Sequence, residues 1–293
     1  MKLISKTITI LGVAAALSGL SPIVYAQPSQ TQRTQPEPSV QNEPAPETNS
    51  ELSNRPDLNL LAKTVTNFLK SERYQTESEL LLTGTATGAT FTSSVQIKTI
   101  TQFPKQFRSE IAFTQSGGSE ATRYLVVSNG NQVWTYHPDL KQYAVTDYET
   151  FDKSRDTFLI GLSSSLFLEM PADFREILAE GALSDQSVIE VLDQMLQSKD
   201  VPLKGGMRNL QGTAYYVYEY TDSKQGYTFS VLVKPETATI EQIQIAGKSA
   251  GLDLLVREQI LRRLENPVVA ADTFSFSPTE GITKVESLPI KPY

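Results

Sequence analysis

Hydrophobic and polar residues follow two different periods along the chain. Residues 58–69 carry apolar side chains at three- and four-residue spacing, which is typical of an amphipathic helix. Asp57 stands directly before this pattern and is a candidate N-cap. From about Glu77 the period changes to two, as in a strand with one apolar face. The pattern therefore predicts a helix followed by a sheet.

The alternation continues as a series of short strands, and no helix follows each strand. Asn129-Gly130 separates two alternating runs, which is a strong hairpin signal, and His137-Pro138-Asp139 predicts the next turn. Parallel strands need a long crossover between them, so this order predicts an antiparallel meander. The strands expected from the pattern are 91–98, 107–113, 124–128, 132–136, 142–145, 214–220, 227–234 and 240–246.

Residues 152–200 interrupt the strands with apolar residues at helical spacing. Residues 252–265 fit a helix and a strand equally well, and both interpretations stay open. The predicted fold class is α+β: a long antiparallel sheet, an N-terminal helix and a helical insertion between the two halves of the sheet. Such a sheet curls because strands twist, so its concave apolar face needs a cover. The insertion is the expected cover.

The N-terminal residues resemble an export signal. Lys2 and Lys6 precede an apolar run over 8–20, and Val24-Tyr25-Ala26 offers small residues for cleavage before Gln27. The apolar run is too short to span a bilayer comfortably, so we expect cleavage and a soluble periplasmic protein. Residues 27–56 are rich in proline and polar side chains, which predicts a disordered tether. The expected organisation is thus 1–26 signal peptide, 27–56 tether and 57–293 a single domain.

Composition excludes several classes of function. The net charge of −7 argues against a nucleic-acid partner, which needs a basic surface. Without cysteine the chain has no disulfide, no thiolate metal site and no cysteine to carry a lipid anchor. A single histidine, His137, excludes multi-histidine metal sites. We expect no metal and no cofactor.

Two motifs could suggest catalysis. Gly161-Leu162-Ser163-Ser164-Ser165 lacks the closing glycine of a nucleophile elbow and lies in a helical pattern, so close packing of small residues is the favoured interpretation. His137 lies in a predicted turn, where a solvated side chain is more common than a general base. We therefore expect a protein that is not an enzyme. A hydrolase that depends on His137 remains a third hypothesis.

Three further segments resemble a known family. Phe103-Pro104-Lys105 starts a strand, and 128–143 contains the run Ser-Asn-Gly-Asn-Gln-Val-Trp-Thr-Tyr-His-Pro around Trp134. Residues 274–282 read Phe-Ser-Phe-Ser-Pro-Thr-Glu-Gly-Ile. These segments are similar to the hairpins and closing segment of the periplasmic outer-membrane lipoprotein carriers, the LolA-like family. The resemblance implies an open β half-barrel wrapped over helices, with acyl chains as ligands. Where that family has an arginine that helps hold the helical lid, this chain has Phe103.

The resemblance and the pattern together give two hypotheses. The first is a periplasmic carrier of a lipid or lipoprotein, held between the concave face and the helices of 152–200. An acyl chain of about 16 carbons costs roughly 13 kcal/mol to expose to water, which such a cavity would avoid. The second, motivated by Phe103 and the tether, is a regulatory or assembly module that senses lipid or binds a protein.

Either protein would be a monomer, and a carrier would meet a membrane-bound donor or acceptor protein. Phe103 is the expected lid position. Alternation selects the following candidates for the cavity lining: Phe91, Val95, Ile97, Phe107, Ile111, Phe113, Trp134, Tyr136, Phe158, Leu162, Tyr216, Tyr218, Phe229 and Val231.

Overall fold

The computed structural model describes most of the chain beyond residue 51. The described residues are 52–86, 89–114, 121–170, 202–223, 226–249, 252–288 and 290, with 172, 175, 186, 188–190 and 193. The predicted signal peptide, almost all of the predicted tether and most of the insertion beyond residue 170 lie outside them. Within this part of the chain, no helix has the length and apolar content needed to cross a membrane.

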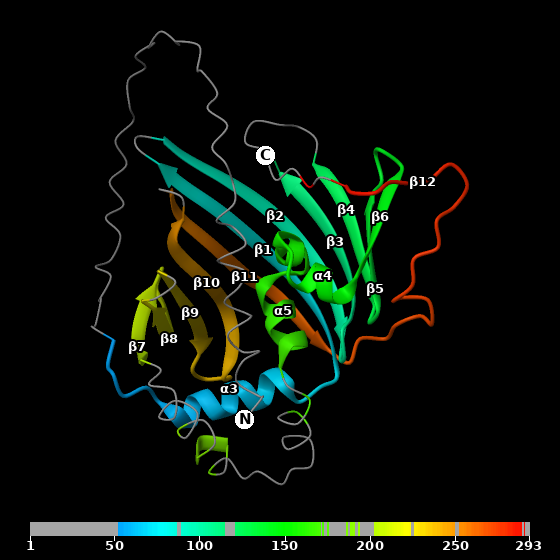
Figure 1. Cartoon of the computed structure of the whole chain (residues 1–293). Coiled ribbons are helices and arrows are strands. Elements are labelled where there is room, and N and C mark those ends of the chain that lie inside the picture. The colour runs from blue at the N-terminus through cyan, green and yellow to red at the C-terminus, as the bar shows by residue number, and fades with distance from the viewer. Residues whose placement is uncertain are drawn as a thin grey trace.

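One curved sheet of twelve strands forms the body of the molecule (Figure 1). The strands are β1 (Arg73–Ala86), β2 (Ala89–Gln102), β3 (Gln106–Thr114), β4 (Thr122–Asn129), β5 (Gln132–His137), β6 (Gln142–Asp147), β7 (Leu203–Leu210), β8 (Thr213–Asp222), β9 (Tyr227–Lys234), β10 (Thr239–Ser249), β11 (Leu252–Glu265) and β12 (Thr283–Lys284). The described helices are α3 (Leu58–Leu69), α4 (Tyr148–Asp152), the 3-10 helix η2 (Arg155–Ile160) and α5 (Leu162–Glu169).

The sheet consists of two antiparallel meanders that meet at its centre. Its order is β12-β6-β5-β4-β3-β2-β1-β11-β10-β9-β8-β7, so the first and second halves of the chain join where β1 pairs with β11. All strand pairs are antiparallel except the short parallel contact between β12 and β6. Every strand expected from the alternation lies inside an observed strand, which confirms the predicted open antiparallel α+β fold.

Two parts of the sheet go beyond the prediction. Residues 252–265, which fitted a helix or a strand, form β11 and pair on both sides. β7 was not predicted, because Gly205-Gly206 and Asn209 interrupt any apolar alternation. Gly205 also pairs with Ser53 through two backbone hydrogen bonds of 2.9 Å, so chain contacts begin within the last residues of the predicted tether.

The sheet has an inner face, which contacts α5 and carries the hydrophobic core, and an opposite outer face. Leu80, Val95, Phe107, Phe113 and Ile243 of the inner face are at most 1% exposed. Phe151 of α4 and Phe158 of η2 pack on this core, with ring centroids 5.5 Å from Phe107 and 6.4 Å from Phe113 respectively. The helices after β6 therefore cover the concave side, as the sequence predicts (Figure 1).

Helix α3 crosses the end of the inner face near β10 (Figure 1). Asp57 caps it as predicted, since its Oδ1 accepts a hydrogen bond of 3.0 Å from the backbone N–H of Leu60. Two tyrosines of β8 fix the same end of the helix. The backbone N–H of Asp57 donates to the Tyr216 hydroxyl, and the Tyr218 hydroxyl donates to the Asp57 carbonyl, each at 2.7 Å.

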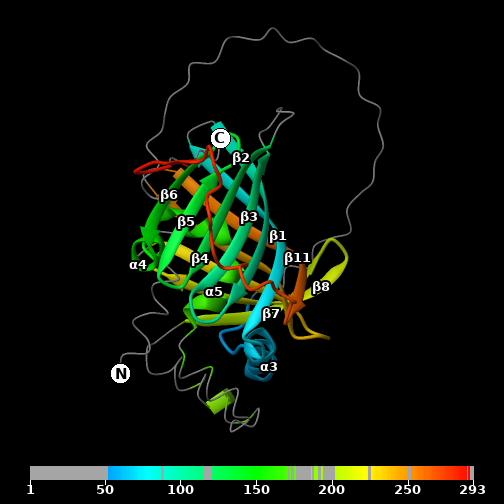
Figure 2. The ribbon, with the colours of Figure 1, turned by 90° about the vertical axis from the view of Figure 1, so that its right-hand side faces the viewer.

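The C-terminal segment crosses the outer face of β3–β6 (Figure 2). Phe276 packs its ring on Tyr136 and Tyr143, with centroids 5.5 and 5.3 Å apart. β12 then pairs with the free edge of β6, where the N–H groups of Thr283 and Val285 donate to carbonyls of the β6 side. The closing segment noted in the sequence thus belongs to the outer side of the molecule.

Candidate ligand-binding face

The structure brings most of the predicted lining residues together on the inner face. The following side chains are buried in one core: Val95, Ile97, Phe107, Ile111, Phe113, Phe158 and Leu162. Phe229 is partly buried against that core, and Val231 lies between Tyr218 and Ile243 in the adjoining strands. Phe91 is 44% exposed and lies over Gly84, where an added Cβ would come within 2.1 Å of its ring.

Two of the candidates lie on the other face of the sheet, and two more have a different role. Trp134 and Tyr136 point to the outer face, because their neighbour Val133 belongs to the inner core and alternate residues face opposite sides. Tyr136 is covered there by Phe276. Tyr216 and Tyr218 lie on the inner side but serve to hold the start of α3. Burial raises the pKa of the Tyr218 hydroxyl, which stays protonated as this donor role requires.

Polar side chains of the sheet hold the helical cover through its backbone. Thr99 Oγ1 donates to the carbonyl of Ile160 at 3.0 Å, and Ser109 Oγ donates to the carbonyl of Leu159 at 2.7 Å. Both side chains are at most 1% exposed. Because these hydroxyls satisfy carbonyls at the end of η2, that turn can lie on an apolar sheet without losing its hydrogen bonds.

Glu258 of β11 is the most unusual group of the inner face, since it has no exposed surface. Its carboxylate accepts hydrogen bonds from the backbone N–H of Ser163 at 2.6 Å and from the Ser163 hydroxyl at 2.9 Å. These donors lie in the first turn of α5, where partial positive charge favours a carboxylate. Burial nevertheless raises the pKa of Glu258, and hydrogen bonds from Ser163 and Ser78 and the charge of Arg263 offset only part of that rise.

Gly161 allows this contact. Its φ of +82° suits glycine, and a Cβ on this residue would lie 2.7 Å from Oε1 of Glu258. Ser163, Ser164 and Ser165 follow and are all buried. The interpretation of this serine run as close helix packing is therefore confirmed, and one of the serines also binds the buried acid.

The other end of α5 is held by stacking of arginines on aromatic rings. The guanidinium of Arg175 lies 4.4 Å from the ring centroid of Phe103 and 4.0 Å from that of Phe167, and it donates to the carbonyl of Phe167. The predicted lid position thus carries an aromatic ring, and the cation comes from the insertion. Burial lowers the pKa of Arg175 to about 10, which leaves it charged at neutral pH.

Arg263 of β11 completes this cluster. Its guanidinium lies 4.0 Å from the ring centroid of Phe68 and 3.8 Å from that of Tyr74, and Nη2 donates to the carbonyl of Phe68 at 3.1 Å. Such stacking is worth about 0.5–2 kcal/mol per pair. Arg263 therefore links α3 to the sheet beside the point where α5 ends.

His137 is not solvated, although its place in a turn predicted that it would be. His137 is 8% exposed and stacks edge-on against Tyr124 at 4.7 Å, so it is packed rather than solvated. Its Nδ1 has no hydrogen-bond partner among the described residues.

Glu258, Arg175 and Arg263 are site residues that were not predicted from the sequence. One signal was available for Glu258, which continues the alternation of Leu254 and Val256 and so had to share their apolar face if the segment was a strand. The two arginines have apolar neighbours in the sequence, such as Phe174 and Leu264, but no local pattern shows that a cation is buried there, and only the fold brings them to aromatic rings.

The inner face and its helical cover define an open antiparallel half-barrel with a helix-covered concave side. No protein-family model and no curated protein matches the sequence. Solved structures with a similar fold include a LolA superfamily protein from Nitrosomonas europaea, at 10% identity and a TM-score of 0.28 over 74% of this chain and 96% of that one. They also include a putative outer membrane lipoprotein-sorting protein domain from Vibrio parahaemolyticus, at 12% identity and a TM-score of 0.33 over 74% and 95%.

The MucA/MucB complex of Pseudomonas aeruginosa is a third similar structure, at 12% identity and a TM-score of 0.32 over 75% of this chain and 60% of that one. The neighbours thus include the LolA superfamily that the sequence resembles. Because the superpositions are loose, they assign no ligand to this chain.

Proposed function

We propose that this protein binds an acyl chain of a lipid or lipoprotein in the periplasm, on the inner face beneath the helices that follow β6. The apolar surface of this face supports the proposal, because it extends beyond the closed core under α5. Leu82 and Phe229 are only partly buried against that core, and Phe91 beyond them is 44% exposed. This partly exposed apolar extension is the observation on which the proposal rests.

The energies of cover and ligand are compatible with exchange. Four hydrogen bonds join the described cover to the sheet side chains Thr99, Ser109 and Glu258. At about 0.5–1.5 kcal/mol net for each, they contribute about 2–6 kcal/mol. Burial of an acyl chain of about 16 carbons gains roughly 13 kcal/mol. A ligand can therefore offset the loss of these hydrogen bonds, provided that the apolar side chains of the cover, such as Phe158 and Phe167, pack on the ligand in place of the sheet.

Ligand extraction and uptake test the proposal. Purified protein is extracted with organic solvent for mass spectrometry, and uptake of a fluorescent fatty acid is titrated. Leu82→Trp fills the inner extension and is expected to weaken uptake at least fivefold. Leu261→Trp, at a site on the outer side that is 60% exposed, is the matched control and leaves uptake unchanged. Protein that is empty and takes up no fatty acid would contradict the proposal.

A specific observation also favours the second candidate, a regulatory or assembly module that binds a protein partner. Among the described residues, Ser53 pairs with Gly205 alone, and no strand pairs with the backbone groups of Met207 and Asn209 that point the same way, so they could pair with an added strand. Met207→Pro removes one of these N–H groups, and Met207→Leu is its control. Loss of a stoichiometric periplasmic partner in the proline variant alone would support this function, and recovery of lipid without any protein partner would exclude it.

A further inference from the structure

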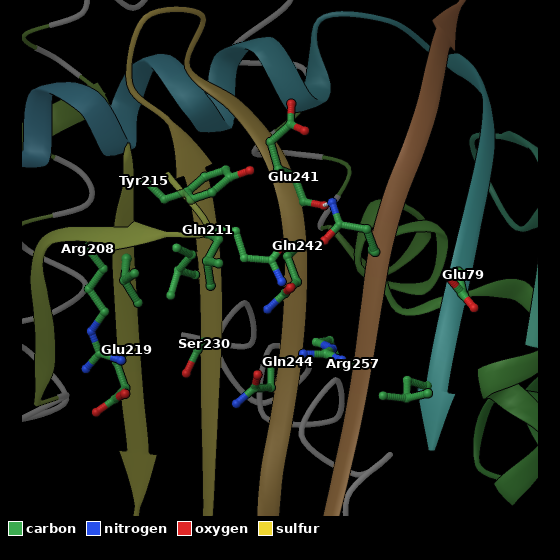
Figure 3. Close-up of a pocket in the computed structure, with 15 residues that line it drawn as sticks. Glu79, Arg208, Gln211, Tyr215, Glu219, Ser230, Glu241, Gln242, Gln244 and Arg257 are labelled. Carbon is green, nitrogen blue, oxygen red and sulfur yellow. Dashed lines mark hydrogen bonds between the residues drawn. The ribbon is translucent and has the colours of Figure 1, made fainter. Parts of the chain in front are cut away.

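The outer face of β7–β11 carries a hollow of about 650 Å³ with a largely polar lining (Figure 3). It lies on the side of the sheet opposite α5. Arg257 and Gln259 line it, while Glu258 between them points to the inner face and binds Ser163. The volume lies within the range of about 300–1,000 Å³ that is usual for small-molecule sites.

The floor of this hollow is apolar and its walls are polar. Val217 and Leu232 face outward at the base of the hollow but are only 3% and 6% exposed. Leu81 and Leu210, which also line the hollow, are half-buried and offer the apolar surface that a ligand can reach. Gln211, Gln242 and Gln244 stand beside them with their amides in the hollow (Figure 3). A ligand here would rest on an aliphatic surface and meet hydrogen-bonding groups around its edge.

Some polar groups of the hollow have partners: Glu79 accepts from Ser94, Glu241 accepts from Thr239, and Gln259 donates to the Glu241 carbonyl. Within the described part of the chain, neither Arg208, Arg257 nor Glu219 forms an ion pair or a side-chain hydrogen bond, and Nε of Arg208 is buried without a partner. These three half-buried side chains are therefore the groups that a ligand can reach and bind.

A second hollow of about 720 Å³, on the outer face of β2–β4, provides a contrast. Four of its charges form two ion pairs: Lys98 lies 3.5 Å from Glu77, and Arg108 lies 3.7 Å from Glu110, while the exposed Arg123 forms none among the described residues. In the first hollow, none of the five charged side chains forms an ion pair with another described residue.

The charges indicate which class of ligand fits. Arg208 and Arg257 would attract an anion, but Glu79, Glu219 and Glu241 line the same hollow and would repel it. A cation would be attracted by these carboxylates but repelled by the two arginines. A neutral polyhydroxylated ligand is compatible with both kinds of charge, because its hydroxyl groups donate to carboxylates and accept from guanidinium groups. The side-chain amides of the hollow can donate to or accept from the same hydroxyl groups. The aliphatic floor suits the apolar face of a sugar ring.

We propose that the hollow formed by Arg208, Glu219, Gln242, Gln244 and Arg257 over the floor of Val217 and Leu232 binds a neutral oligosaccharide. This site is independent of the acyl-binding inner face, since the two lie on opposite sides of the sheet.

Calorimetric titration of the purified protein with maltotriose and N,N′,N″-triacetylchitotriose, both neutral, tests the proposal, with citrate and spermidine as charged controls. We expect at least one trisaccharide to bind with a Kd below about 1 mM and both charged compounds to bind at least tenfold more weakly. The double variant Arg257→Leu/Gln244→Leu is expected to weaken sugar binding at least tenfold. The matched variant Lys98→Leu/Gln96→Leu, in the second hollow, leaves it unchanged.

Two further measurements locate the sugar site and separate this proposal from the acyl-chain proposal. In the unmodified protein, the side-chain amide NMR signals of Gln242 and Gln244 should shift on adding sugar, which locates the site without any substitution. Fatty-acid uptake should be the same in the Arg257→Leu/Gln244→Leu variant, so failure of one proposal does not affect the other. The proposal is overturned if neither trisaccharide binds at this strength, if citrate or spermidine binds as well, or if the amide signals do not move.

Discussion

Replacement of Glu258 by glutamine separates the charge of this side chain from its shape. Glu258 is fully buried and accepts two hydrogen bonds from Ser163 at the start of α5. Glutamine keeps an acceptor for the Ser163 N–H, fills the same volume and has no charge to desolvate. Because burial raises the pKa of Glu258, the ionised side chain is less favourable in the folded protein than in the unfolded chain.

The sign of the pH effect follows from proton binding. The folded protein binds this proton more tightly than the unfolded chain, whose carboxyl has its ordinary pKa of 4.5. The contribution of Glu258 to the free energy of unfolding is therefore largest below that value and decreases as the pH rises toward the folded-state pKa. Each unit of the rise corresponds to about 1.4 kcal/mol of stability lost at higher pH. Glu258→Gln should remove this decrease.

Urea unfolding between about pH 4 and pH 8 measures the effect. We expect Glu258→Gln to have a flatter profile than the unmodified protein and to be at least as stable at the upper end. Glu258→Ala should be less stable than Glu258→Gln throughout, because it leaves the buried Ser163 N–H without a partner, at about 1–3 kcal/mol, and creates a cavity. Glu110→Gln, an exposed carboxylate of the outer face, is the control. A glutamine variant with an unaltered pH profile would refute the reasoning.

Three further substitutions test the contacts that hold the helices. Gly161→Ala should lower the free energy of unfolding by about 1–3 kcal/mol, measured by urea unfolding, since φ is +82° and the new Cβ would lie 2.7 Å from Glu258; an unchanged midpoint would contradict this close approach. Arg175→Met should increase amide hydrogen exchange in α5 by removing two stacking contacts worth about 0.5–2 kcal/mol each, whereas equal exchange in both proteins would show that these contacts hold nothing. Tyr218→Phe removes the hydrogen bond to the Asp57 carbonyl and should cost about 0.5–1.5 kcal/mol, with Tyr215→Phe on the outer face as a control expected to cost nothing.

Local patterns were sufficient to predict most elements of this fold. The alternation of Phe107, Ile111 and Phe113 reports a single buried face, and Asn129-Gly130 reports a tight turn, because both depend on near neighbours in the sequence. Asp57 predicts a helix start for the same reason. The pairing of β1 with β11 joins residues far apart in the chain, and no local pattern specifies it.

Alternation separates two faces of a strand but does not say which of them is inner. Trp134 and Tyr136 share the more aromatic face of β5, which suggested the core, yet this face is covered from outside by the C-terminal segment around Phe276. The burial of charged residues could not be predicted from the sequence for a related reason. Glu258 and Arg263 are buried only because β11 lies between β1 and β10, with α3 and α5 packed across it.

The two ends of the sheet have a consequence for how the molecule can deform. β12 pairs with part of β6, and Ser53 pairs with Gly205 of β7. At each end of the sheet, a short stretch of the chain's own backbone therefore pairs with part of the edge. A barrel protects its edges by closing on itself, which fixes its circumference. Here the sheet stays open and each edge is covered separately, so its curvature is not fixed by the closure that sets a barrel's circumference.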